Sequence, residues 1–148
     1  MTRIALASDH AGFALKADLV AWLREDGNQV SDLGAVSDAS VDYPDYGYKL
    51  GAAVAACEAE FGIAICGSGI GIAIAVNRNP ACRCALVSDG LSARLARSHN
   101  DANVLALGAR LIGPETARDC VSQFLATPFL GDRHTARVAK LATPESTA

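Results

Sequence analysis

One of the five cysteines stands directly before a glycine-rich loop, in the pattern Cys66-Gly67-Ser68-Gly69-Ile70-Gly71. Glycines at alternate positions let backbone N–H groups converge on a small anionic group at the positive end of a following helix. The same dipoles favour the thiolate form of Cys66, which is the form that removes a proton. The loop alone leaves two interpretations of Cys66 open, a base and a buried small hydrophobic residue.

Charged side chains that could act beside this loop come later in the chain. His99 is expected at a helix C-terminus, where the dipole favours its protonated form, and it continues the stripe of Leu91 and Leu95, which is predicted to face inward. Arg133 and Arg137 lie one helical turn apart and repel each other unless an anion such as phosphate lies between them. The alternatives are a core or capping histidine and a solvated basic face.

Short apolar runs alternate with amphipathic stretches along the chain, which predicts strands and helices in turn. Strands are expected at residues 4–7, 29–33, 61–66, 82–87 and 104–107. Helices are expected around residues 15–23, 46–60, 72–76, 91–99, from 114 onward, and at 133–141, with loops at 34–44 and 100–103.

Continuous apolar strands separated by helices are typical of a parallel sheet that is covered on both faces. The sequence therefore predicts an α/β fold, a three-layer doubly wound sandwich with a five-stranded parallel sheet, Rossmann-like in type. Ligands of such sheets bind at the carboxyl ends of the strands, which selects four segments as candidate site: 8–10, 66–71, 88–90 and 108–110.

The bulk properties narrow the function classes. The 148 residues are predicted to form one domain, 1–148, with a disordered tail at 143–148, and the formal charge of -3 argues against a nucleic-acid partner. No segment is expected to be a signal peptide or a membrane span, so we expect a cytoplasmic protein. The cysteines suggest neither a disulfide framework nor a zinc site, and Cys82 and Cys84 are expected on one strand face in the core.

Five segments, taken together, resemble those of one enzyme family. They are Ser8-Asp9-His10-Ala11-Gly12-Phe13, Asp42-Tyr43-Pro44, Ile65-Cys66-Gly67-Ser68-Gly69-Ile70-Gly71, Ser98-His99-Asn100-Asp101-Ala102-Asn103-Val104-Leu105 and Gly131-Asp132-Arg133-His134. Their order and spacing resemble the ribose-5-phosphate isomerase B family, which also includes allose-6-phosphate and galactose-6-phosphate isomerases.

The resemblance implies interconversion of D-ribose 5-phosphate and D-ribulose 5-phosphate through an enediolate, an aldose–ketose isomerisation of the pentose phosphate pathway. It implies no metal and no cofactor, and a homodimer or dimer of dimers with active sites shared at the subunit interface. A branch of the family carries glutamate as the base at the position of Ile72. This chain has Cys66 instead, which resembles the cysteine branch.

The resemblance also implies roles for individual residues. Cys66 matches the proton-abstracting cysteine, His99 the histidine that opens the furanose ring, and Ser68 a threonine that handles protons. The segment 67–71 matches the anion hole for the enediolate. Ligand-binding positions are matched by Asp9, His10, Tyr43, Gly67, Ser68, Gly69, Ile70, Gly71, Asn100, Arg110, Arg133 and Arg137.

Purely structural interpretations of several of these residues stay open at this point. Asp9 could equally cap a helix, His10 could be a loop residue, Tyr43 could brace its loop, and Arg110 could form a surface ion pair. The glycine loop, with Asp89 about 20 residues on, also permits a nucleotide- or phosphometabolite-binding module without chemistry. A thiol redox role for Cys66 is a weaker alternative because no second cysteine lies at a CxxC spacing.

Overall fold

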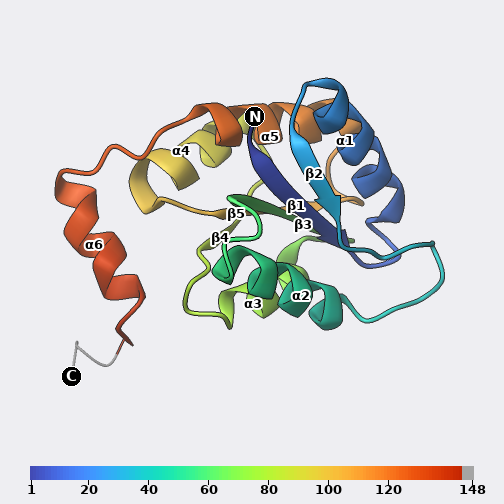
Figure 1. Cartoon of the computed structure of the whole chain (residues 1–148), viewed down its shortest axis with the longest axis horizontal. Helices are drawn as coiled ribbons and strands as arrows, with labels where there is room; N and C mark the ends of the chain where they lie inside the picture. Colours follow the sequence, from blue (N-terminus) through green and yellow to red (C-terminus); the bar gives the residue numbers. More distant parts are fainter. Residues whose placement is uncertain (145–148) are drawn as a thin grey trace.

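The computed structural model describes residues 1–144 and contains a five-stranded sheet in the order β2-β1-β3-β5-β4, with every neighbouring pair parallel (Figure 1). The strands are β1 (Arg3–Ser8), β2 (Gln29–Asp32), β3 (Phe61–Cys66), β4 (Cys84–Leu86) and β5 (Val104–Gly108). The predicted parallel sheet is confirmed.

Helices cover both faces of the sheet. One face carries α1 (Phe13–Glu25), α4 (Gly90–Asn100) and α5 (Pro114–Ala126), and the other carries α2 (Tyr43–Ala55) and α3 (Ile70–Asn77). Figure 1 shows these helices above and below the strands, so the predicted three-layer sandwich is confirmed. The last helix, α6 (Arg133–Leu141), covers neither face and stands beyond α4 at the left of the view.

The central strands sort their side chains by size between the two faces. Since successive side chains of a strand alternate, Ile4 and Leu6 face the cluster under α1 and α5, whereas Ala5 and Ala7 face α2 and α3. Small residues also let α2 and α3 approach each other closely: a Cβ on Gly47 of α2 would lie 2.7 Å from the Cβ of Ala75 of α3. This packing fixes the start of α3, which follows the cysteine loop directly.

Several element boundaries differ from the prediction. α2 begins at Tyr43, because Pro44 fits the first helical turn, where its missing N–H costs nothing, so both residues leave the predicted loop. Asn100 ends α4 rather than starting a loop. β4 is only three residues long, so Cys82 precedes the strand, although both Cys82 and Cys84 pack on the cluster shared with α2 and α3.

The inward stripe predicted for α4 is wrong. Leu91 and Leu95 are 55% and 37% exposed, and the face of α4 that packs on the core is formed by Ala93, Ala96 and Arg97. Two alanines let α4 lie close to α5, so the larger leucines are turned outward.

The C-terminal end of α4 is held by Arg97. Its guanidinium lies 4.9 Å from the ring centre of Phe61 and 5.8 Å from that of Phe124, and it donates hydrogen bonds to Asp101 and to the carbonyl of Ala102. The planar cation lies over two aromatic rings and bonds the chain just beyond the helix end. The last turn of α4 is therefore anchored in the core.

All five cysteines are free thiols. Among the described residues, no helix is both long and apolar enough to cross a membrane. The tail predicted to be disordered, 143–148, lies outside the described residues from position 145 onward.

Candidate active site

The loops that follow β1 and β3 meet at the carboxyl edge of the sheet, where the strands end. β1 and β3 are neighbours, and the helix after β1 lies on the opposite face from the helix after β3. The chain therefore leaves the sheet in opposite directions at this point, the topological switch at which doubly wound folds bind ligands. Residues 9–10 follow one of the two strands and residues 66–71 include the end of the other.

The glycine loop directs its backbone at Cys66. The Gly69 N–H donates to Sγ of Cys66 at 3.1 Å, and such a donor stabilises negative charge on the sulfur. Gly69 has a φ of 77°, and a Cβ there would lie 2.8 Å from the backbone of Leu107, so only glycine fits. The Ser68 hydroxyl accepts the N–H of Ile70 at 3.2 Å.

Two N–H groups of the loop stay open to a ligand. Within residues 1–144, the N–H groups of Gly67 and Ser68 donate to no protein acceptor. They precede the N-terminus of α3, whose dipole adds positive potential at the same place. The loop thus places two N–H groups without a protein acceptor in residues 1–144 beside a buried thiol, and the anion hole predicted from the sequence stays a prediction.

Asp9 and His10 are fixed opposite the loop. The Asp9 N–H donates to the carbonyl of Ile65, and its carboxylate accepts the Gly12 N–H at 3.1 Å, within the turn before α1. Gly12 is the N-cap of that helix and no side chain caps it, so Asp9 is not the helix cap. Nδ1 of His10 lies 3.2 Å from both the backbone nitrogen and oxygen of Val41. These bonds orient both side chains from the backbone.

Tyr43 and Arg110 pack against glycines of the loop. A Cβ on Gly71 would lie 2.6 Å from the Tyr43 ring, and one on Gly67 would lie 3.2 Å from Nη1 of Arg110. The ring and the guanidinium thus flank the loop directly. We call Asp9, His10, Tyr43, residues 66–71 and Arg110 the cradle half of the candidate site.

The remaining predicted residues lie elsewhere in the chain. His99 and Asn100 form the last turn of α4, and Arg133 and Arg137 are exposed on α6, which packs beside that turn. We call these four residues the helix half of the candidate site.

The two halves lie at opposite edges of the sheet. α4 starts after the end of β4, and its last residue precedes the start of β5, so His99 lies at the amino edge, where the strands begin. Cys66 pairs with Gly108, four residues beyond the start of β5 at Val104, which corresponds to about 13 Å of strand. One chain therefore does not bring His99 to Cys66.

The sequence interpretation missed His134 as a member of the site. Its ring stacks on His99, with centroids 4.4 Å apart and planes 13° from parallel. His134 is also buried, unlike the rest of its helix. His134 lies between Arg133 and Arg137 in the sequence, but helical spacing turns it to a different face from theirs. That spacing could have indicated that His134 faces inward while the two arginines face outward.

A buried ion pair under the cradle half was also missed. Lys16 is 1% exposed, and its Nζ lies 2.7 and 2.8 Å from the two carboxylate oxygens of Asp32. Asp32 also accepts the Gly34 N–H, and Gly34 in turn accepts the N–H of Ser8, the residue before Asp9. A lysine inside an amphipathic helix gives no sequence signal for such a role.

Asp89 does not support the nucleotide-binding alternative. Its two oxygens accept the N–H and the hydroxyl of Ser92 at 2.7 and 2.9 Å, which caps the start of α4. Both carboxylate oxygens of Asp89 are therefore used in capping α4 rather than directed at a ribose hydroxyl.

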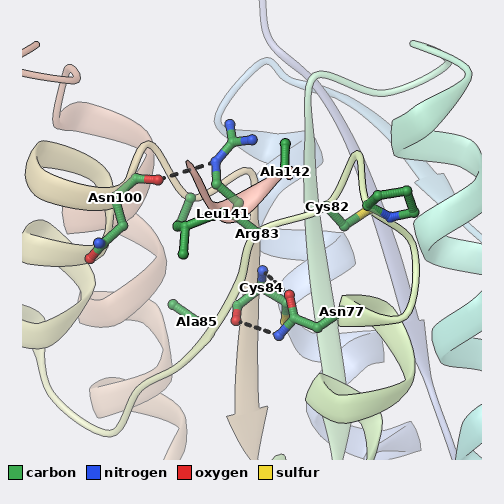
Figure 2. A pocket seen from close by; sticks show the side chains of 10 residues that line it. Asn77, Cys82, Arg83, Cys84, Ala85, Asn100, Leu141 and Ala142 are labelled. Atoms are coloured by element: carbon green, nitrogen blue, oxygen red, sulfur yellow. Dashed lines mark hydrogen bonds between the residues drawn. The ribbon is translucent and has the colours of Figure 1, made fainter. Parts of the chain in front are cut away.

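A cavity of about 360 Å³ lies between β4 and the end of α6, and Figure 2 shows the side chains that line it. It contains Asn100 but no other predicted site residue. The Arg83 guanidinium points at the backbone carbonyls of Asn100 and Asp101, at 2.8–3.1 Å, so its positive charge is already used. The cavity is therefore a poor phosphate site.

No three His, Cys, Asp or Glu side chains of residues 1–144 lie close enough together to hold a metal ion.

Known proteins share both the sequence and the fold of this chain. Residues 4–141 match the model of the Ribose/Galactose Isomerase family. Ribose-5-phosphate isomerase B of Escherichia coli (strain K12) is 43% identical over 145 residues, which are 98% of this chain and 97% of that protein.

Solved structures give the same result. A ribose 5-phosphate isomerase of Thermotoga maritima is 49% identical, with a TM-score of 0.94 over 95% of this chain and 97% of its own. Ribose-5-phosphate isomerase B of Mycoplasma genitalium, solved with bound ribulose-5-phosphate, is 36% identical, with a TM-score of 0.92 over 98% of this chain and 97% of its own.

Proposed function

The chain belongs to the Ribose/Galactose Isomerase family, and from that premise we propose that it interconverts D-ribose 5-phosphate and D-ribulose 5-phosphate, with Cys66 as the base. The observation that carries the proposal is the cradle half, in which the Gly69 nitrogen lies 3.1 Å from the Cys66 sulfur beside two N–H groups that have no acceptor among the described residues. The relatives at 36–49% identity support the choice of substrate.

The proton transfer uses the cradle half. The Cys66 thiolate removes the proton from the second carbon of the open-chain aldose, and the electron pair moves onto the carbonyl oxygen to form an enediolate. Backbone N–H groups of Gly67 and Ser68 stabilise that oxyanion. The Ser68 hydroxyl moves a proton between the two oxygens, and the thiol returns its proton to the first carbon, which completes the ketose without a redox partner.

The helix half serves recognition and ring opening. Arg133 and Arg137 bind the phosphate dianion, because two guanidinium groups one turn apart match its oxygens, and His10 and Arg110 complete the pocket. His99 protonates the ring oxygen to open the furanose. Asp9, Asn100 and Tyr43 contact the sugar.

No metal or cofactor takes part in these proposed steps. The absence of a metal, the absence of a cofactor and the cytoplasmic location all stay predictions.

A second copy of the chain brings the halves together. β4 is one of the two edge strands, and exposed apolar side chains lie on β4 itself and on α3 and α4: Ile70, Ile74, Leu86, Leu91 and Leu95. A two-fold axis beside β4, perpendicular to the strands, sets the carboxyl edge of one copy against the amino edge of the other. His99 of each copy then faces Cys66 of its partner, in a homodimer or a dimer of dimers.

Solvent exchange tests the chemistry. We expect purified protein in chelator and heavy water to form ribulose 5-phosphate from ribose 5-phosphate and to place deuterium on the second carbon of recovered aldose. Cys66→Ala should lower kcat by about 10²–10⁴-fold while ligand binding persists. Unchanged turnover in that variant removes Cys66 from the mechanism, and binding without exchange in the wild type favours a binding module.

Mixing two inactive variants tests the shared site. Cys66→Ala and His99→Ala chains, coexpressed, form some dimers in which one site holds both changes and the other holds neither. Random pairing should then restore roughly a quarter of wild-type activity. Mixtures no more active than the two variants alone contradict sharing between chains.

Other aldose phosphates are the second candidate, because the family name includes a galactose enzyme. A pocket distinguishes one extra carbon by only about 1–3 kcal/mol. Values of kcat/KM for ribose 5-phosphate, allose 6-phosphate and galactose 6-phosphate decide between them.

A further inference from the structure

α6 touches the rest of the chain mainly through one side chain. Of its nine residues, from Arg133 to Leu141, only His134 is buried. Two hydrogen bonds hold the described connection before it on α4: the Leu130 N–H donates to the carbonyl of Ser98, next to His99, and the Arg97 guanidinium donates to the carbonyl of Thr127. Figure 1 shows α6 standing away from the sheet, beyond α4. The position of the helix therefore depends on what His134 contacts.

The contact of His134 is a ring stack rather than a hydrogen bond. Its imidazole lies 4.4 Å from that of His99 and 13° from parallel, while its Nε2 is buried without a hydrogen-bond partner in residues 1–144. A polar ring that is buried without a partner loses hydration, so this placement is not explained by polar bonding.

The surroundings of His134 keep its ring neutral. Burial lowers the pKa of His134, and the charges of His99, Arg133 and Arg137 lower it further, against an opposing effect of Asp132. A neutral ring can face a protonated His99, whereas two imidazolium rings at 4.4 Å would repel each other.

We propose that His134 is a positioning residue for ring opening: its stacked ring holds the His99 imidazole in the orientation that reaches the ring oxygen of the sugar phosphate. The inference rests on the proposed function, in which His99 opens the furanose. Arg133 and Arg137 lie on the exposed face of the same helix. A phosphate held by these arginines therefore fixes α6, and His134 passes that placement on to His99.

A substrate that cannot cyclise separates ring opening from proton transfer. The hydroxyl that would close the furanose of erythrose is esterified in erythrose 4-phosphate, so this aldose reaches the enzyme already open. His134→Ala should lower kcat/KM for ribose 5-phosphate about 10- to 100-fold, the cost of a misplaced group, and change that for erythrose 4-phosphate less than about threefold.

Two further variants make the comparison specific. His134→Phe keeps a flat ring without a titrating group and should restore most of the ribose 5-phosphate activity. Thr135→Ala changes an exposed neighbour on α6 and should leave both substrates unaffected. Equal losses on both substrates in His134→Ala, or no loss on either, overturn the proposal.

A structural readout keeps the test decisive if erythrose 4-phosphate is turned over too slowly. The chain has three histidines, so the ring signals of His99 can be assigned by NMR in the full-length protein. We expect them to shift and broaden in His134→Ala but not in Thr135→Ala, and unchanged signals overturn the proposal. A failure of the proposed function differs, since the wild type itself would then not turn over ribose 5-phosphate. A failure of the role of His99 alone would leave His99→Ala with full activity on ribose 5-phosphate.

Discussion

The cradle half and the helix half of the candidate site are built in different ways. In the cradle half, glycines stand where a side chain would meet close neighbours: a Cβ on Gly69 would lie 2.8 Å from the backbone of Leu107, and one on Gly71 would lie 2.6 Å from the Tyr43 ring. In the helix half, α6 has one buried residue, and its arginines are exposed. The difference teaches that Cys66 and its loop are fixed by the packing of one chain, whereas the arginines of α6 have little packing of their own to hold them.

The largest effect is expected from breaking the cradle half. Gly69→Ala places a Cβ 2.8 Å from the backbone of Leu107 at a φ of 77°, so the loop must move away from Cys66. Displacing such donors should lower kcat by about 10²–10³-fold, measured with saturating ribose 5-phosphate.

Gly113→Ala is the matched control for that change. No atom lies within 4 Å of a Cβ on Gly113, and its φ is -84°, so the added methyl group meets no obstacle. We expect its kcat to match the wild type. A Gly69→Ala enzyme with normal kcat shows that the cradle half is not rigid.

The next largest effect concerns the support beneath the cradle half. Lys16→Met leaves the Asp32 carboxylate without its buried partner and should lower the free energy of unfolding by about 2 kcal/mol, since that carboxylate keeps some contact with water. Urea denaturation measures the loss. Lys49 is an exposed lysine on α2, and Lys49→Met should change the free energy of unfolding little. Equal decreases in the two variants would show that the ion pair does not stabilise the fold.

A smaller effect is expected in the helix half. Arg137→Ala removes one charge-assisted contact to phosphate and should raise KM for ribose 5-phosphate about 10- to 100-fold, with kcat changed much less. Steady-state kinetics separate the two parameters. Lys140→Ala on the same helix is the control, and a fall in kcat alone would place Arg137 in the chemistry instead.

The smallest effect tests α4, which joins the two edges of the sheet. Hydrogen bonds from the N–H and hydroxyl of Ser92 lower the pKa of Asp89. A lowered pKa favours the charged carboxylate, so its stabilisation is present at neutral pH and is lost as the pH falls through the folded-state value.

Asp89→Asn keeps an acceptor for the cap but removes the charge. We expect a slightly lower melting temperature at neutral pH and a difference from the wild type that shrinks in acid, measured by thermal unfolding. A difference that grows as the pH falls has the wrong sign for this explanation.

Local sequence patterns predicted most of the fold because strand and helix periodicities are short-range. The alternation of Ile4 and Leu6 with Ala5 and Ala7 is visible in the sequence and corresponds to two packed faces. The glycine loop was equally local, since its three glycines and Cys66 are adjacent. The prediction that Leu91 and Leu95 face inward failed because apolar character alone cannot distinguish a core face from an exposed apolar face.

The arrangement of the candidate site was less accessible. Residue types indicated Cys66 and His99 equally well, but their separation depends on which edge of the sheet each element end reaches. The stack between His99 and His134 and the pair between Lys16 and Asp32 join residues 35 and 16 positions apart, respectively. Such contacts follow from tertiary packing, which no local pattern in a single sequence reveals.

The placement of Cys66 and His99 at opposite ends of the strands has a consequence for a newly synthesised chain. If the site is shared as proposed, a single monomer contains every functional group but no complete site, so catalysis should begin only after two monomers associate. On refolding from denaturant, the lag before turnover should shorten as protein concentration rises, even though each chain folds at a rate that is independent of concentration.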